Sequence, residues 1–305
     1  MRDLIRHVSH LPAKWMVPPA DVVSVNEPSR SASSPRRIMQ DLSRLSGTTA
    51  LVTGASGGIG AEFAARLAQR GADLVLVARS GDKLEALASS LRSAHGVRVL
   101  TEKLDLSEPE APRAMFEWTV EHGLEVGFLV NNAGGGVGGA AAKADPAVVA
   151  AMVTLNGQAV VENTIRFLPG MVSRGRGTIV NVTSASAFLP TPYLAAYGAS
   201  KAMAQSFTLA VGTEVADAGV RVLAVSPGVT VTGQKSEDIL PTMGRLGGLR
   251  QPEQVVTTAF RALDSRKASV VDGRRNALFA RLVQRLPDRT TRALGRRLTT
   301  RLTGF

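Results

Sequence analysis

The sequence predicts an α/β protein in which a doubly wound parallel β-sheet carries helices on both faces. Continuous apolar runs such as Leu74–Ala78 alternate with amphipathic segments of helical length. Fully apolar strands are typical of a parallel sheet whose two faces are both covered. A glycine-rich turn, Thr53–Gly60, stands between the first strand and the first helix and favours the same arrangement. At 305 residues, the chain is long enough to bury a sizeable core.

Each element is placed by its local pattern. Strands are expected where short apolar runs occur, and helices where apolar residues recur at helical spacing. The expected strands are Thr49–Thr53, Leu74–Ala78, Val97–Leu104, Val126–Val130, Thr178–Val182, Val220–Val225 and Ala268–Val271. The expected helices are Ala61–Arg70, Lys83–Ala94, Pro109–His122, Pro146–Met171, Tyr197–Ala218 and Glu253–Leu263.

Both ends of the chain differ from this periodic body. Residues 1–46 contain five prolines and the run Ser29–Ser34, without sustained periodicity, and are predicted to be a mobile N-terminal extension. Only Ile38–Leu45 has the pattern of a short helix. Residues 47–275 are expected to form the single catalytic domain, and residues 276–305 a basic amphipathic tail.

The charge of the chain is concentrated near its C-terminus. The net charge is +11, and residues 245–305 contain 14 Lys and Arg against 4 Asp and Glu. Asn276–Leu286 and Arg289–Leu302 are predicted to be basic amphipathic helices, broken at Pro287. Three roles are open for them: docking on a membrane surface, covering the mouth of a substrate site, or packing in a dimer. A nucleic-acid partner is not expected, because aromatic residues are only 4% and no basic recognition motif occurs.

Composition excludes several kinds of site. The chain has no cysteine, which removes disulfides, thiolate metal sites and a cysteine nucleophile. Its four histidines lack metal-ligand spacing, so no metal is expected. No apolar run approaches the roughly 18–20 residues that span a bilayer, and the N-terminus lacks the apolar core of a secretory signal. A cytoplasmic protein, with membrane association through the tail as an added option, is therefore expected.

The glycine-rich turn predicts a dinucleotide site. The strand ending at Thr53 leads directly into Gly54-x-x-x-Gly58-x-Gly60 and then into a helix. Glycines at such a turn let the backbone approach a pyrophosphate, whose charge is stabilised at the helix N-terminus. The spacing differs from the more familiar G-x-G-x-x-G, but the strand–turn–helix context is the one that dinucleotide binding requires.

The end of the second strand predicts the type of cofactor. An acidic side chain there would bind the ribose 2′-hydroxyl, whereas a cation would accommodate a 2′-phosphate. Arg79 follows Ala78 directly, no acid is present, and Ser80 adds a hydroxyl donor. Because arginine can bind phosphate by a bidentate contact, the sequence predicts NADP(H).

A tyrosine and a lysine predict acid–base chemistry. Tyr197 and Lys201 are four residues apart and therefore share one face of a helix. An ammonium beside a phenol is expected to lower the phenol's pKa from about 10, so that it can exchange a proton near neutral pH. Ser184 precedes the tyrosine by thirteen residues.

From about Thr48 to Thr232, the sequence resembles the short-chain dehydrogenase/reductase family. The matching motifs are the TGxxxGxG loop Thr53–Gly60, the NNAG run Asn131–Gly134, and the Ser184, Tyr197 and Lys201 triad. The resemblance implies a Rossmann-type sheet and a catalytic set of Asn156, Ser184, Tyr197 and Lys201. The cofactor residues that it implies are Thr53, Gly54, Ser56, Gly58, Ile59, Gly60, Arg79, Ser80, Asp105, Asn132, Gly134, Tyr197, Lys201, Pro227, Gly228 and Thr232.

The resemblance also implies roles. Asp105 would close the adenine pocket, Pro227–Thr232 would contact nicotinamide, and Asn156 would hold a catalytic water. Two positions depart from the family pattern. Gly57 stands where many NADP-preferring relatives carry Lys or Arg, and Gly157 follows Asn156 directly, which loosens the family's NxxG.

The expected activity is NADPH-dependent reduction of a ketone or aldehyde, with Tyr197 as general acid. The expected substrate lining is Gly135–Asp145, Ala187–Ala196 and Val229–Arg250, whose first two segments are largely Gly, Ala and apolar residues. This composition favours an apolar, lipid-like or 3-oxoacyl carbonyl, although the glycines could equally serve loop mobility. A homo-oligomer, dimer or tetramer, is expected. The alternatives are an oxidative alcohol or hydroxysteroid dehydrogenase, or a catalytically retired cofactor-sensing or scaffold protein.

Overall fold

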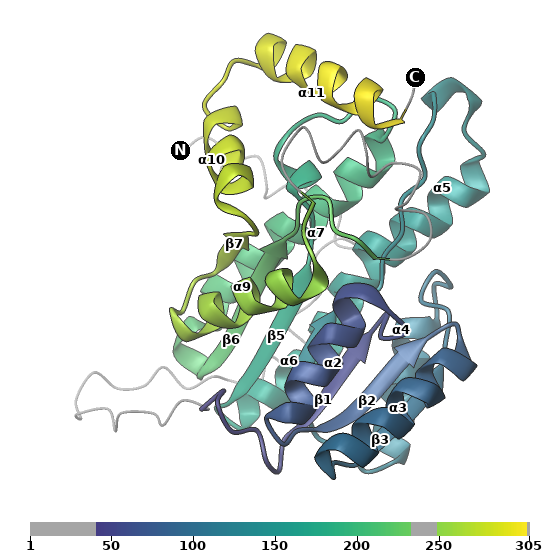
Figure 1. Cartoon of the computed structure of the whole chain (residues 1–305), viewed down its shortest axis with the longest axis vertical. Coiled ribbons are helices and arrows are strands. Elements are labelled where there is room, and N and C mark those ends of the chain that lie inside the picture. Colours follow the sequence, from purple (N-terminus) through teal and green to yellow (C-terminus); the bar gives the residue numbers. More distant parts are fainter. Residues whose placement is uncertain (1–40, 233–248, 304–305) are drawn as a thin grey trace, which may run out of the picture. The chain divides into compact units, whose positions relative to one another are not determined.

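The computed structural model describes residues 41–232 and 249–303, and a seven-stranded sheet forms its core (Figure 1). The strand order is β3-β2-β1-β4-β5-β6-β7, and all neighbouring strands are parallel. The predicted α/β fold with a doubly wound parallel sheet is confirmed. The strands are β1 Thr49–Thr53, β2 Asp73–Ala78, β3 Val99–Lys103, β4 Val126–Asn131, β5 Gly177–Val182, β6 Val220–Ser226 and β7 Ser269–Val271.

Helices connect the strands and cover both faces of the sheet. Helices α2, α3 and α9 supply buried side chains to the cluster on one face, and α4, α6 and α7 to the cluster on the other. The helices are α2 Gly58–Gln69, α3 Gly81–His95, α4 Ala111–Glu121, α5 Pro146–Val153, α6 Ala159–Ser173, α7 Ala195–Glu214, α9 Pro252–Asp264, α10 Arg274–Val283 and α11 Asp288–Thr303.

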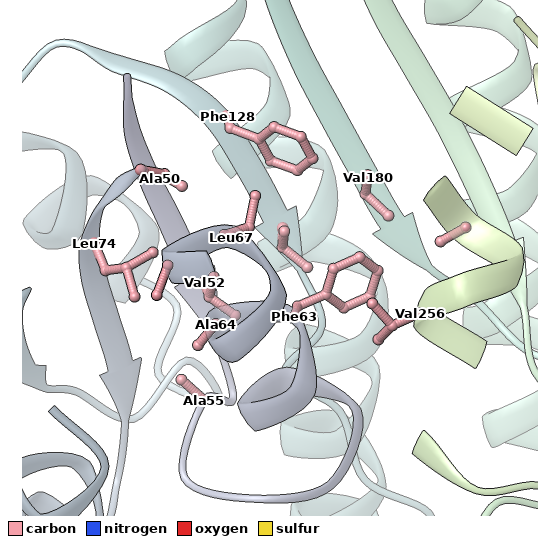
Figure 2. Packing of buried hydrophobic residues seen from close by; sticks show 14 of the residues in the cluster. Ala50, Val52, Ala55, Phe63, Ala64, Leu67, Leu74, Phe128, Val180 and Val256 are labelled. Carbon is pink, nitrogen blue, oxygen red and sulfur yellow. The ribbon is translucent and has the colours of Figure 1, made fainter. Parts of the chain in front are cut away.

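The core follows from the alternation of side chains along each strand. On β1, Val52 belongs to the cluster beneath α2 and α9, while Leu51 belongs to the cluster on the opposite face. Figure 2 shows the first cluster, in which Phe63 of α2 lies among strand side chains. Its ring centroid is 6.1 Å from that of Phe260 on α9. Burying one such aromatic side chain contributes about 1.5–3 kcal/mol, so this packing fixes α2, and with it the turn before α2.

The strand order creates a crevice at the carboxyl ends of the strands. β1 pairs with β2 on one side and with β4 on the other. The connections that leave β1 and β4 therefore run to opposite sides of the sheet. In open parallel sheets, ligands bind at such a reversal point.

One predicted helix is divided in the structure. The sequence predicts a single helix over Pro146–Met171, but α5 ends at Val153 and a π-helical segment, Thr154–Gln158, precedes α6. The wide turn contains Asn156 and Gly157. Because π-helical turns leave the regular hydrogen-bond ladder, they are frequent at functional sites.

The packed unit begins before the predicted domain boundary. Leu42 and Leu45 lie within the segment predicted to be an extension, yet both are buried in the core. The Arg70 guanidinium donates to the Leu42 carbonyl at 2.8 Å, and the Leu45 N–H donates to the Arg70 carbonyl at 2.7 Å. From residue 41 onward, the expected Ile38–Leu45 helix is replaced by turns, and its first residues lie outside the described part.

A buried ion pair joins Asp272, directly after β7, to Arg250, shortly before α9. Asp272 is fully buried and accepts from the Arg250 guanidinium at 2.6 and 2.9 Å. The Thr258 hydroxyl of α9 also donates to it, at 2.6 Å. The hydrogen bonds that Arg250 donates to Asp272 raise the pKa of Arg250, although burial opposes this. These contacts therefore hold together the end of β7, the segment at Arg250 and helix α9.

Replacing Asp272 by Ala is expected to lower the free energy of unfolding by about 3 kcal/mol, because removing one partner leaves a partly buried guanidinium unpaired. For a domain of this size, the thermal midpoint should fall by about 6–12 °C in a calorimetric scan. Glu117→Ala is the matched control, because its contact with Arg113 at 3.8 Å lies on the surface. A midpoint for Asp272→Ala as high as that of this control would contradict the prediction.

Candidate active site

A large cleft, of about 1520 Å³, lies at the carboxyl ends of the described strands. It extends from the ends of β2 and β3 to the start of α7. Most predicted site residues line it. The lining includes Gly54, Ser56, Gly58, Ile59, Arg79, Ser80, Asp105, Asn132, Gly134, Ser184, Tyr197, Lys201, Pro227, Gly228 and Thr232.

Three predicted residues do not line the cleft. Thr53, Gly60 and Asn156 are all buried. A Cβ on Gly60 would collide with the Gly54 carbonyl oxygen and lie 2.5 Å from the Asn132 side-chain nitrogen. The glycine therefore allows α2 to begin directly against the turn, which aims the N-terminus of α2 into the cleft.

Thr53 joins the glycine-rich turn to the loop after β4. Its hydroxyl accepts from the N–H groups of Asn132 at 2.9 Å and Ala133 at 3.0 Å, and it donates to the Val130 carbonyl at 3.2 Å. The Asn132 amide in turn donates to the Thr53 carbonyl at 3.0 Å. These bonds fix the floor of the cleft on both sides of the reversal point.

Two basic side chains, Arg79 and Lys83, lie just after the end of β2. Arg79 is 73% exposed, and its guanidinium lies 3.7 Å from the Asp105 carboxylate. Burial tends to raise the pKa of Asp105, but hydrogen bonds from Ser107 and the charge of Arg79 bring it below its usual value. Lys83, which the sequence analysis missed, also lines the cleft. Its position in the first turn of α3, shortly after the strand end that carries Arg79, was the signal that could have identified it.

The predicted catalytic triad converges at the other end of the cleft. Helix α7 carries Tyr197 and Lys201 one turn apart, and Ser184 precedes a 3₁₀ turn, Ala185–Phe188. The Ser184 hydroxyl accepts from the Ser186 N–H at 3.2 Å, which orients it. The buried Lys201 ammonium donates to the Val182 carbonyl at 3.0 Å. Burial lowers the pKa of Lys201 to about 8.

The charge of Lys201 does not determine the direction in which the pKa of Tyr197 shifts. Burial raises the pKa of the Tyr197 phenol, and the hydroxyls of Ser184 and Ser186 oppose this increase. The Lys201 ammonium instead meets the Val182 carbonyl at the end of β5. The prediction that Lys201 lowers the pKa of Tyr197 is thus corrected for the protein by itself.

Asn156 is held by both atoms of its side-chain amide. Its nitrogen donates to the Gly135 carbonyl at 2.8 Å, and its oxygen accepts from the Gly135 N–H at 3.1 Å. A Cβ built on Gly134 would lie 3.0 Å from the Asn156 oxygen and 3.1 Å from the Lys201 nitrogen. Asn156 and Lys201 therefore border the same small space beneath the cleft.

The predicted substrate lining is found in part. From those segments, Gly135, Gly136, Leu189, Thr191, Leu194 and Val229–Thr232 line the cleft, and residues 233–248 lie outside the described part. Residues that the sequence analysis did not assign to a site are also present. Among them are Leu155, Arg275, Asn276, Phe279, Leu298 and Thr299. Long-range packing brings them there, and no sequence spacing signals it.

The comparisons with known proteins agree on one family. A family model described as short chain dehydrogenase matches residues 48–239. A very-long-chain 3-oxoacyl-CoA reductase of Phaeosphaeria nodorum is 36% identical over 190 residues, which are 61% of this chain. They are 56% of that protein, so the chain spans about half the length of this curated relative.

Solved structures give the same result. A short-chain dehydrogenase from Sphingobium yanoikuyae in complex with NADPH has a TM-score of 0.66 and 34% identity, covering 73% of this chain and 87% of that one. A 7β-hydroxysteroid dehydrogenase has a TM-score of 0.74 and 27% identity, covering 84% of this chain and all of that one. With a family model matched over more than half of its length, this chain belongs to the short-chain dehydrogenase family.

Proposed function

We propose that the protein is an NADP(H)-dependent oxidoreductase that reduces a ketone or aldehyde with a lipid-like, 3-oxoacyl type of chain. The convergence of Ser184, Tyr197 and Lys201 on the cleft that begins at the glycine-rich turn carries this proposal. The relatives named very-long-chain 3-oxoacyl-CoA reductase support the substrate class, and the relative in complex with NADPH supports the cofactor.

The chain's residues fit this cofactor. The N-terminus of α2 and the close approach at Gly60 suit a pyrophosphate. Arg79 and Lys83, both at the cleft, suit a 2′-phosphate, and no acidic side chain follows β2 directly. Asp105, Asn132, Gly134 and Pro227–Thr232 are proposed to hold the remainder. When bound, the cofactor supplies the hydride that the chain's own side chains cannot provide.

The mechanism assigns a role to each of the four predicted catalytic residues. Negative charge that develops on the substrate oxygen is stabilised by hydrogen bonds from the Ser184 and Tyr197 hydroxyls. Tyr197 donates its proton to that oxygen. The Lys201 ammonium, which the Val182 carbonyl holds in place, would bind the cofactor's ribose. Asn156 keeps the π-helical turn and Gly135 in place, so that a water beside Lys201 can return a proton.

Turnover with a panel of carbonyl compounds tests the proposal. The purified protein is titrated with NADPH and NADH, and NADPH oxidation is followed with ketones, aldehydes and 3-oxoacyl thioesters. Tight NADPH binding with turnover supports the reductase. The same assay run in the oxidative direction, with hydroxysteroids and alcohols, tests the alternative function. Similarity to the 7β-hydroxysteroid dehydrogenase supports that alternative. NADPH binding without turnover in either direction would contradict catalysis and favour a cofactor-binding scaffold.

The rate of reduction should fall as the pH rises through about 8. Burial lowers the pKa of Lys201 to about 8, so the ammonium is present below this value and is lost above it. Reduction uses the protonated form, so kcat/KM should decline on the alkaline side. A pH profile of kcat/KM reports the pKa values of groups in the free enzyme. In Lys201→Arg the guanidinium stays charged, so this decline should move to higher pH. A wild-type profile that stays level through pH 8 would refute the assignment.

We also propose a homo-oligomer. Large apolar side chains are exposed on α6 and α7, among them Ile165 at 54%, Met203 at 45% and Leu209 at 36%. Exposed apolar side chains on these two helices are the observation that supports association of protein chains. Light scattering coupled to size exclusion gives the mass in solution, and a mass of one chain at micromolar concentration would contradict the proposal.

Peripheral membrane contact through the C-terminal helices is the other partner that we propose. In the part of the chain that the structure describes, no helix has the length and apolar character to cross a membrane. Helix α10 instead exposes Leu278 at 59% and Leu282 at 52%, with Arg281 and Arg285 beside them. Such a face suits anionic lipid. Co-sedimentation with vesicles containing phosphatidylserine, but not with neutral vesicles, is expected. Equal sedimentation with both would contradict it.

A further inference from the structure

Helices α10 and α11 form part of the cleft, although they follow the segment that the family model matches. The match ends at residue 239, whereas α10 begins at Arg274. Asn276 and Phe279 of α10 and Leu298 and Thr299 of α11 nevertheless line the cleft. The two helices therefore give this chain a wall that the matched family segment does not supply.

The first helix is positioned against the segment proposed to contact nicotinamide. A Cβ on Gly228 would collide with the Asn276 side-chain nitrogen. The same nitrogen donates to the Asp272 carbonyl at 2.9 Å, which holds the amide in place. Because Asp272 is itself fixed by Arg250, the start of α10 is tied to the Pro227–Thr232 loop. Phe279, one turn beyond Asn276, is thereby directed to the cleft.

The second helix is positioned against the loop between Ser184 and Tyr197. A Cβ on Gly295 would collide with the Pro190 carbonyl oxygen and lie 3.5 Å from the Cδ atom of Pro192. Thr299 is buried, and its hydroxyl donates to the Gly295 carbonyl at 2.8 Å, so it packs without an unpaired polar group. Leu298 is three residues beyond Gly295 and therefore shares its helix face.

Apolar side chains thus surround the catalytic end of the cleft from two directions. Leu155, Leu189 and Leu194 come from the domain that the family model matches, while Phe279 and Leu298 come from the C-terminal helices. The side chains of Phe279 and Leu298 are partly exposed, which is what contact with a ligand rather than with the core requires. Binding surfaces of this composition accept apolar groups.

We propose that Phe279 and Leu298 bind the apolar chain of the carbonyl substrate and determine which chain length the enzyme prefers. The inference rests on the proposed reductase function and names the residues that select its substrate. Each methylene buried against this wall strengthens binding about fourfold. Substrates whose carbonyl carries a long apolar chain should therefore be preferred over their short homologues.

The test compares two substrates in matched variants. 3-Oxoacyl thioesters of about 4 and about 16 carbons differ only in the methylenes that the wall would bury. In Phe279→Ala/Leu298→Ala, the ratio of kcat/KM for the long over the short substrate should fall at least about tenfold, with NADPH affinity unchanged. Leu298→Trp narrows the cleft and should also reduce the ratio, by excluding the long chain. Val120→Ala, at an exposed apolar position of α4 outside the cleft, should leave the ratio as in the wild type.

Binding without turnover separates this inference from the proposed function. Calorimetric titration with 2-dodecanone should give an affinity at least about tenfold weaker in the double alanine variant than in the wild type. If the wild type reduced no carbonyl compound but this difference in affinity were found, the proposed function would be contradicted. The inference that Phe279 and Leu298 bind an apolar chain would still stand. An unchanged substrate ratio together with unchanged 2-dodecanone affinity, in variants with a wild-type melting temperature, would overturn the inference.

Discussion

Replacing Tyr197 by Phe is expected to reduce kcat for carbonyl reduction by about 100- to 10,000-fold, the usual contribution of general acid catalysis. The variant keeps the ring and its packing on α7 but loses the hydroxyl that would donate to the substrate oxygen. NADPH affinity should change little, because Arg79, the glycine-rich turn and Lys201 remain. Stopped-flow measurement of NADPH oxidation gives the chemical step, and fluorescence titration gives the cofactor affinity.

The chain provides a matched control for this experiment. Only two tyrosines occur, and Tyr193, the other one, precedes Tyr197 by four residues without lining the cleft. Tyr193→Phe should therefore retain near-normal kcat. A Tyr197→Phe enzyme with a rate within about threefold of the wild type would remove Tyr197 from the catalytic step, since a factor of three corresponds to less than 1 kcal/mol of transition-state stabilisation.

The parts of the fold that were predictable from sequence are those set by local pattern. Thr49–Thr53 was expected as a buried strand and is β1, because its apolar run permits burial on both faces. The Tyr197 and Lys201 pair was predictable for a similar reason, because helical spacing alone places both on one face. The glycine-rich turn needed only its flanking strand and helix to be interpreted.

The remaining features depend on contacts between distant segments, which spacing does not record. Nothing in the sequence near Lys201 indicates that its ammonium reaches the Val182 carbonyl, so its effect on Tyr197 was mispredicted. The π-helical turn at Thr154–Gln158 contains the poor helix formers Thr154, Asn156 and Gly157, but nothing in their spacing distinguishes a widened turn from a regular one. The segments that form α10 and α11 were correctly expected to be helical. Their place in the cleft depends on Gly228 and Gly295, which local pattern does not distinguish from loop or helix glycines.

Reversing the charge at Arg79 is expected to weaken NADPH binding by about 100-fold, because a charge-assisted hydrogen bond to phosphate is worth about 1.5–3 kcal/mol. In Arg79→Asp, a carboxylate would stand beside Asp105, whose oxygen is already 3.7 Å from the guanidinium. Two acids, one after β2 and one after β3, repel a 2′-phosphate and can accept from a ribose 2′-hydroxyl. NADH binding should therefore weaken much less, and the preference should reverse.

A second surface ion pair, Arg98 with Asp73, provides a control that separates this effect from a general change in net charge. Arg98 lies 3.8 Å from Asp73 at the opposite ends of β2 and β3, so Arg98→Asp changes the net charge equally but far from the cleft. It should alter NADPH affinity little at physiological salt, because charges beyond about 8 Å are screened. If Arg79→Asp kept its preference for NADPH, Lys83 would have to provide the phosphate contact. The affinity of Arg79→Asp for NADPH relative to NADH therefore decides which of the two cations selects the cofactor.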